Sequence, residues 1–150
     1  MRTPPSFSKG SDVTMDSLLD MHRQAVLAHP SCQPFWDATR EGRLLLPKCT
    51  ACGRHHWYPR TFCPLCHSPE VRWETAIGRA RVHACTSLLR DPARTVTAFV
   101  ELEEGPLMLT HLIGRELAAW RIGDALQVEF RELETGLHLP VFRALGEGLV

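Results

Sequence analysis

Residues 49–66 read CTACGRHHWYPRTFCPLC, two Cys-x-x-Cys pairs separated by ten residues. The tight turn in each Cys-x-x-Cys pair directs two thiolates at one point, so two such turns supply the four corners of a tetrahedron around a metal ion. Gly53, directly after the first pair, and Pro64, inside the second, fit such turns. The spacing therefore predicts a zinc site whose ligands are Cys49, Cys52, Cys63 and Cys66.

Four thiolates fill the coordination sphere of zinc and leave no position for water or substrate. We therefore expect a structural metal that stabilises a small module. Iron is the alternative metal, because the same four sulfurs accept it. Two unrelated pairs of buried or redox-active thiols are the alternative to a metal site. The nearby His55, His56 and His67 are interpreted as surface or packing residues, since four cysteines are already available.

The two remaining cysteines lie outside this cluster. Neither Cys32 nor Cys85 has an obvious basic neighbour in the sequence that would activate it as a nucleophile, so we assign no catalysis to either. Cys85 falls in the middle of a predicted strand, where a lone cysteine is usually a small buried residue.

The composition limits the class of protein. The 150 residues fit one domain or two small modules, and a hydrophobic content of 44% is enough for a core. Seventeen Lys and Arg balance seventeen Asp and Glu, which argues against a polybasic nucleic-acid arm or an acidic tail. No apolar run reaches the ~18 residues of a membrane-spanning helix, and the first ten residues lack the apolar core of a secretory signal. We expect a cytoplasmic protein that does not bind membranes and has reduced thiols.

The first half of the chain divides by its patterns. Residues 1–13, rich in Pro, Ser and Gly, are predicted to be a flexible tail. Helical periodicity and capping residues predict N-terminal helices within 14–42, one over 14–28 and one over 34–42. The short strand and the cysteine region that follow, 43–69, form the predicted zinc ribbon.

Residues 70–150 alternate apolar and polar residues in short bursts, which is typical of half-buried strands. Five strands with a short helix over 115–120 between the third and fourth are the element order of the OB-fold, a five-stranded Greek-key barrel. From the pattern alone, a small sandwich competes with this interpretation. In the first strand the pattern places Val82, Ala84, Thr86 and Leu88 on one face. The five predicted strands are 80–88, 95–102, 107–113, 125–131 and 140–143.

Further motifs follow one another in a specific order over residues 34–145. They are PFWD (34–37), RLLLPKCTACG (43–53), HWYPR (56–60), CPLCH (63–67), GRARV (78–82) and LPVFR (139–143). Together these motifs resemble the DUF35 family. The resemblance implies a mainly β protein with N-terminal helices, a rubredoxin-like zinc ribbon and a C-terminal OB-fold.

The resemblance also implies a function. By this resemblance, the chain is similar to non-catalytic proteins that partner thiolase-superfamily enzymes. Those enzymes include thiolases, retro-aldolases that shorten steroid side chains, and acyltransferase complexes. We therefore expect a subunit that binds and orders a thiolase-like enzyme and helps accommodate an acyl-CoA substrate. The sequence contains no recognisable catalytic motif, so we expect no turnover of acyl-CoA by the chain alone.

Cations and aromatic residues crowd the predicted ribbon. Lys48, Arg54 and Arg60 lie close in sequence to Trp57 and Tyr58. Guanidinium groups bind phosphate and stack on adenine, so these cations are candidate contacts for CoA or for the partner protein. The alternative role of these cations is to offset the net negative charge of a site made of one zinc ion and four thiolates.

A nucleic-acid-binding module is the alternative function, because zinc-ribbon and OB-fold domains both commonly bind nucleic acid. Such a module usually has a basic stripe and aromatic residues on its binding strands. Here the formal net charge is zero. Acidic residues lie instead on or beside the predicted strands, at Glu101, Glu103, Glu104, Glu129 and Glu132.

Overall fold

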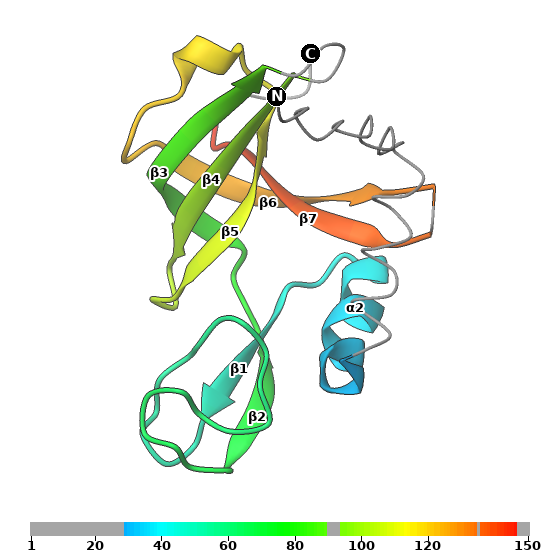
Figure 1. Ribbon diagram of the computed structural model, residues 1–150, viewed down its shortest axis with the longest axis vertical. Helices are drawn as coiled ribbons and strands as arrows, with labels where there is room; N and C mark the ends of the chain where they lie inside the picture. Colours follow the sequence, from blue (N-terminus) through cyan, green and yellow to red (C-terminus); the bar gives the residue numbers. More distant parts are fainter. Residues whose placement is uncertain (1–28, 90–93, 135, 147–150) are drawn as a thin grey trace, which may run out of the picture.

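The computed structural model of the chain describes residues 29–89, 94–134 and 136–146. This part consists mostly of strands, with one short α-helix near its start. Figure 1 shows a small two-stranded ribbon below a five-stranded barrel, with helix α2 beside them. The predicted tail over 1–13 and the predicted helix over 14–28 lie outside the described residues.

Helix α2 (Gln33–Arg40) follows a single 3-10 turn, η1 (Pro30–Cys32). Pro34 lies in the first turn of the helix, where a missing N–H breaks no intrahelical hydrogen bond. The helix ends just before Gly42, whose φ of 70° is the left-handed conformation that often follows a helix. The helix predicted over 34–42 is therefore confirmed.

The ribbon contains two antiparallel strands, β1 (Leu45–Cys49) and β2 (Val71–Thr75). The segment between them, residues 50–70, returns to the end of β1, where the N–H of Thr50 donates to the carbonyl of Glu70 at 2.9 Å. β2 lies in the range 70–150 that the sequence pattern placed in the barrel, yet it pairs with β1 along its whole length.

The other five strands close into a barrel in the order β3-β4-β5-β7-β6. All neighbours are antiparallel except β5 and β7, which run parallel. All five predicted strands form, and their closure confirms a barrel rather than a small sandwich. The elements are β3 (Arg79–Leu89), β4 (Arg94–Leu102), β5 (Leu107–Ile113), the 3-10 turn η2 (Leu117–Ala119), β6 (Ala125–Glu132) and β7 (His138–Ala144).

A bulge in β3 corrects one detail of the sequence pattern. Val82 pairs with the buried Val100 of β4, but the register shifts before Ala84, which pairs with the exposed Phe99. One extra residue reverses the direction of every later side chain on the strand. Val82 therefore faces the core, whereas Ala84 and Leu88 lie on the outer side, and the prediction that they share one face is wrong.

Helix α2 joins the ribbon to the barrel through one hydrophobic core. Phe35 and Trp36 of the helix belong to the same buried cluster as Leu46 of β1 and Phe142 of β7. Figure 1 shows the helix beneath β7 and beside the ribbon. Among the described residues, the structure contains no helix with the length and hydrophobicity needed to span a membrane.

Gly78 connects the ribbon to the barrel in a conformation that excludes a side chain. Its φ is 79°, and a Cβ atom there would lie 2.5 Å from Cγ1 of Val128. Gly42 has a similar φ of 70° but no atom within 4 Å of the corresponding position. The two glycines therefore separate the cost of backbone conformation from that of a steric clash.

We predict that Gly78→Ala lowers the free energy of unfolding by about 2–5 kcal/mol, as the sum of left-handed strain and overpacking. The control Gly42→Ala should lose only the conformational part, about 1–2 kcal/mol. Urea unfolding followed by far-ultraviolet circular dichroism measures both. Equal losses in the two variants would contradict the close approach of Gly78 to Val128.

Candidate metal centre

The two Cys-x-x-Cys turns have the same backbone structure. In the first, the N–H of Gly53 donates to the carbonyl of Cys49 at 2.9 Å; in the second, the N–H of His67 donates to that of Cys63 at 2.9 Å. The residue after each pair adopts a positive φ, 73° at Gly53 and 63° at His67. The ribbon therefore contains two equivalent turns, of which only the first has the glycine that its conformation favours.

The four sulfur atoms meet as a tetrahedral metal site requires. All four Sγ atoms lie within 4.8 Å of one another. The Sγ atoms of Cys49 and Cys66 are 3.6 Å apart, and those of Cys52 and Cys63 are 3.8 Å apart. Zinc–sulfur bonds of about 2.3 Å place tetrahedral sulfurs about 3.8 Å apart. The predicted ligands are thus positioned to bind a metal ion, and the described residues contain no other cluster of this kind.

Local interactions shift the pKa values of two of the four thiols in opposite directions. The backbone and side chain of Arg54 hydrogen-bond the sulfur of Cys52 and, against desolvation, lower the pKa of Cys52 to about 6. The backbone of Ser68 favours ionised Cys66, but desolvation and contacts with the other three thiols outweigh it and raise the pKa of Cys66 to about 12. Four sulfurs this close can all be ionised only with a cation among them, which suits a divalent metal ion.

Lys48 does not lie free on the ribbon. Its ammonium group is 3.2 Å from the Glu74 carboxylate, which also binds His55 at 3.0 Å and Arg72 at 2.6 Å. Desolvation opposes ionisation of Glu74, but hydrogen bonds from Lys48, Arg72 and His55 hold the pKa of Glu74 below its ordinary value. This network fixes β1 to β2, because Lys48 and Arg72 face each other across the two strands.

The structure places the other two candidate cations at separate surfaces. Arg54 lies beside Cys52 and lines a cavity of about 560 Å³ between the ribbon and the β4–β5 turn. Arg60 lines a different hollow, which it shares with Tyr58 and Cys32. Lys48, Arg54 and Arg60 therefore do not form one cluster.

None of the three nearby histidines belongs to the four-residue sulfur cluster. His55 pairs with Glu74, and His67 forms the second turn. His56 is only 3% exposed, and its Nδ1 lies 3.3 Å from the Tyr58 carbonyl. Desolvation, together with the positive charge of Arg60, lowers the pKa of His56 and keeps the ring neutral. Burial and a hydrogen bond with Cys32 raise the pKa of Tyr58 to about 12, so its hydroxyl stays protonated.

The two cysteines outside the cluster differ in burial. Cys32 is buried in the core beside α2. Cys85 is exposed, so the expectation of a small buried residue was wrong. Beyond Arg81, β3 pairs only with β4 among the described strands, and this half of the strand is not enclosed by the barrel.

Comparison with known proteins places the chain in a family. Residues 36–72 match the family described as ChsH2, rubredoxin-like zinc ribbon domain. A DUF35 domain-containing scaffold protein of Methanothermobacter thermautotrophicus is 30% identical over 93 residues, covering 57% of this chain and 70% of the relative. The chain belongs to the DUF35 family.

A longer relative shares the same region. A probable enoyl-CoA hydratase alpha subunit of Thermomonospora curvata is 32% identical to this DUF35 chain over 117 residues, or 73% of the chain. The chain spans only 36% of the length of that relative. The similarity therefore concerns one part of the larger protein.

Two solved structures share the fold of this DUF35 chain. The Ltp2-ChsH2(DUF35) aldolase matches with a TM-score of 0.69 and 28% identity, covering 76% of this chain and 94% of that chain. A DUF35 protein of unknown function from Sulfolobus solfataricus matches with a TM-score of 0.60 and 13% identity, covering 87% and 98% respectively, and this second likeness shows the fold alone.

We predict that the purified DUF35 chain contains one equivalent of zinc. The Cys63→Ser variant should contain no zinc, and its ribbon should no longer unfold cooperatively. Cys63 is fully buried, and removing one thiolate breaks the sulfur tetrahedron. Elemental analysis after gel filtration measures the metal, and Cys85→Ser is the matched control because Cys85 is exposed outside the cluster. Iron in place of zinc would support the alternative metal; unchanged metal content in Cys63→Ser would contradict the site.

We predict that His67→Gly raises the free energy of unfolding of the metal-loaded chain by about 0.5–1 kcal/mol. Left-handed strain of about 1–2 kcal/mol is relieved at a φ of 63°, whereas the greater conformational entropy that glycine gives the unfolded chain offsets about 0.4–1 kcal/mol of this gain. The reverse change in the equivalent turn, Gly53→His, should be destabilising. Thermal unfolding at fixed zinc concentration compares them, and a destabilised His67→Gly variant would show that the two turns are not equivalent.

Proposed function

We propose that the chain is a non-catalytic, zinc-containing subunit that binds and orders a thiolase-like enzyme and helps accommodate its acyl-CoA substrate. The observation that carries the proposal is the likeness to the Ltp2-ChsH2(DUF35) aldolase, which extends over 94% of that chain. The relatives described as a scaffold protein and as an enoyl-CoA hydratase subunit agree with an assembly role near CoA thioesters.

Exposed apolar side chains lie on the outer side of the barrel. Register places Ala84, Phe99 and Leu109 directly opposite one another across β3, β4 and β5. Phe99 and Leu109 keep 47% and 55% of their surface exposed, and Leu107 on β5 keeps 40%. A row of exposed apolar side chains on adjacent strands is typical of protein–protein contact. We propose that the thiolase-like partner docks on this outer face, with the acyl-CoA at the boundary of the two proteins.

Arg54 and Arg60 are the proposed contacts for the phosphates of CoA. Both side chains belong to exposed residues on the ribbon, and each borders a cavity. Guanidinium groups bind phosphate through paired hydrogen bonds. Lys48 is a weaker candidate, because its ammonium group already pairs with Glu74. A partner contact is the other role that these cations can serve.

Binding of nucleic acid finds less support in the residues of the barrel. β4 and β5 correspond to the strands on which OB-folds bind their ligands. Their outward positions include Thr97, Phe99, Glu101, Leu107, Leu109 and His111, a mainly apolar set without Lys or Arg. Phosphate backbones require the opposite charge.

The test is co-expression of the full chain with a thiolase-like enzyme of the same organism, followed by gel filtration and an acyl-CoA assay. We expect co-elution, and activity that needs both proteins. Phe99→Asp should abolish co-elution, because an unpaired charge would be buried at the interface. Ile122→Asp is the control, since Ile122 is 75% exposed and lies on the loop before β6.

Two outcomes would overturn this function. If the activity of the partner enzyme were the same with and without the chain, the accessory role would be excluded. If the isolated chain turned over acyl-CoA, it would itself be an enzyme. Salt-sensitive binding of single-stranded DNA or RNA, without co-elution, would favour the nucleic-acid alternative.

A further inference from the structure

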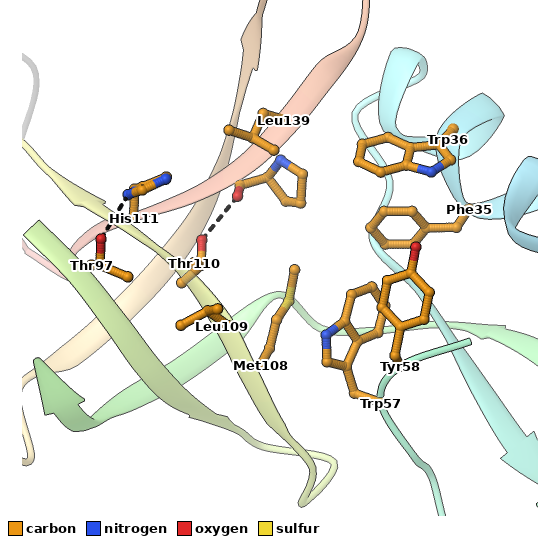
Figure 2. A pocket seen from close by; sticks show the side chains of 11 residues that line it. Phe35, Trp36, Trp57, Tyr58, Thr97, Met108, Leu109, Thr110, His111 and Leu139 are labelled. Atoms are coloured by element: carbon orange, nitrogen blue, oxygen red, sulfur yellow. Dashed lines mark hydrogen bonds between the residues drawn. The ribbon is translucent and has the colours of Figure 1, made fainter. Parts of the chain in front are cut away.

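A third cavity, of about 380 Å³, lies where α2, the ribbon and the barrel meet. Figure 2 shows four aromatic rings on one side of it and the side chains of Met108, Leu109 and Leu139 opposite. Apolar walls with a few polar groups are typical of sites for small molecules. The aromatic rings are those of Phe35, Trp36, Trp57 and Tyr58.

The aromatic wall is fixed by its own packing. The ring of Phe35 lies 5.0 Å from that of Trp36 and 5.0 Å from that of Trp57, and Trp57 lies 5.2 Å from Tyr58, all with edge-to-face or tilted geometry. Phe35 and Trp36 are also almost fully buried. A wall already ordered in this way loses little conformational entropy when a ligand binds.

The cavity is open to solvent. Tyr58 and Leu109 both line it, yet they keep 43% and 55% of their surface exposed. Met108, which is 3% exposed, forms the inner wall. A ligand can therefore enter past Tyr58 and Leu109 without unfolding any strand.

One end of the cavity is polar. Figure 2 shows Thr97 and His111 together, away from the aromatic rings, with the Thr97 Oγ1 and His111 Nδ1 atoms 3.4 Å apart. This contact involves one of the two ring nitrogens of His111. The hydroxyl of Thr97 can form further hydrogen bonds, since a hydroxyl has one donor and two acceptor positions. The Thr110 hydroxyl instead donates to the Pro140 carbonyl at 2.9 Å. Thr97 and His111 can thus bind an oxygen atom of a ligand whose apolar part contacts the rings.

The volume limits the size of the ligand. A closed apolar cavity of about 150 Å³ holds one benzene ring. On that scale a cavity of 380 Å³ accommodates roughly two fused or linked rings with a short substituent. The flat faces of the aromatic wall favour a ring system over a long flexible chain.

We infer that this cavity binds a compact, ring-containing hydrocarbon group whose carbonyl or hydroxyl oxygen is directed at Thr97 and His111. The inference rests on the proposed function and deepens it, because it assigns to the chain the apolar body of the acyl group in addition to the phosphates of CoA. The rings of the ligand stack against Trp57 and Tyr58, which keep exposed surface on the aromatic wall, while its CoA end extends past the open side of the cavity.

Binding is tested on the full chain without any partner, using the two-ring ketone 2-acetylnaphthalene as probe. The chain has four methionines, and Met108 alone lies in the described part. In a ¹H–¹³C spectrum of the chain labelled at its methionine methyl groups, the Met108 signal is the one that disappears in the Met108→Leu variant. We expect a saturable shift of the Met108 signal, because an aromatic probe in the cavity would lie against this side chain.

The matched variants are Leu109→Asp and Leu88→Asp. The two leucines are similarly exposed, at 55% and 52%, but only Leu109 lines the cavity. Leu109→Asp should weaken probe binding at least tenfold, since a charge at an apolar entrance must be desolvated. Leu88→Asp should leave it unchanged. Thermal unfolding of both variants establishes that each is folded.

The inference is overturned if Met108 shows no saturable shift, or if the two variants bind the probe equally. Either result, with co-elution of the partner intact, would leave the accessory role standing. Saturable probe binding in a chain that binds no thiolase-like partner would support the cavity and count against the proposed function instead.

Discussion

The structure of the ribbon depends on four sulfur atoms meeting at one point. β1 and β2 are five residues each, and an isolated two-stranded sheet of this size is marginal in water. The segment between them, residues 50–70, contains no further strand of the sheet and is held at the two turns around Cys49, Cys52, Cys63 and Cys66. A metal ion bound there supplies folding free energy that so small a core cannot.

That constraint extends to the cavity. Trp57 and Tyr58 lie on the chain between the two cysteine turns, so these turns help to position two of the four rings of the aromatic wall. Phe35 of α2 contacts Trp57 on one side and belongs to the core shared with the barrel on the other. The ribbon, the helix and the barrel are thus coupled by packing, and loss of the metal would disturb a surface formed largely by other elements.

Much of the architecture could be predicted because its signals are local. The spacing of the four cysteines identified residues that the fold positions to bind a metal ion, and alternation over short segments identified all five barrel strands. Three features escaped prediction for one reason, which is that they depend on contacts distant in sequence. Alternation does not reveal where a bulge interrupts it, as between Val82 and Ala84, nor which strand β2 joins. The exposure of Cys85 follows from where β3 leaves the barrel.

The sequence by itself determined the four cysteines of the candidate metal site, the strands and the family, because cysteine spacing, side-chain alternation and short motifs are properties of neighbouring residues. Only the tertiary structure decided that Lys48 pairs with Glu74 and that Arg54 and Arg60 lie at different cavities. It alone also formed the apolar cavity, whose walls come from α2, the ribbon and three strands of the barrel. A cavity is the space left when distant segments pack together, and no single segment carries its pattern.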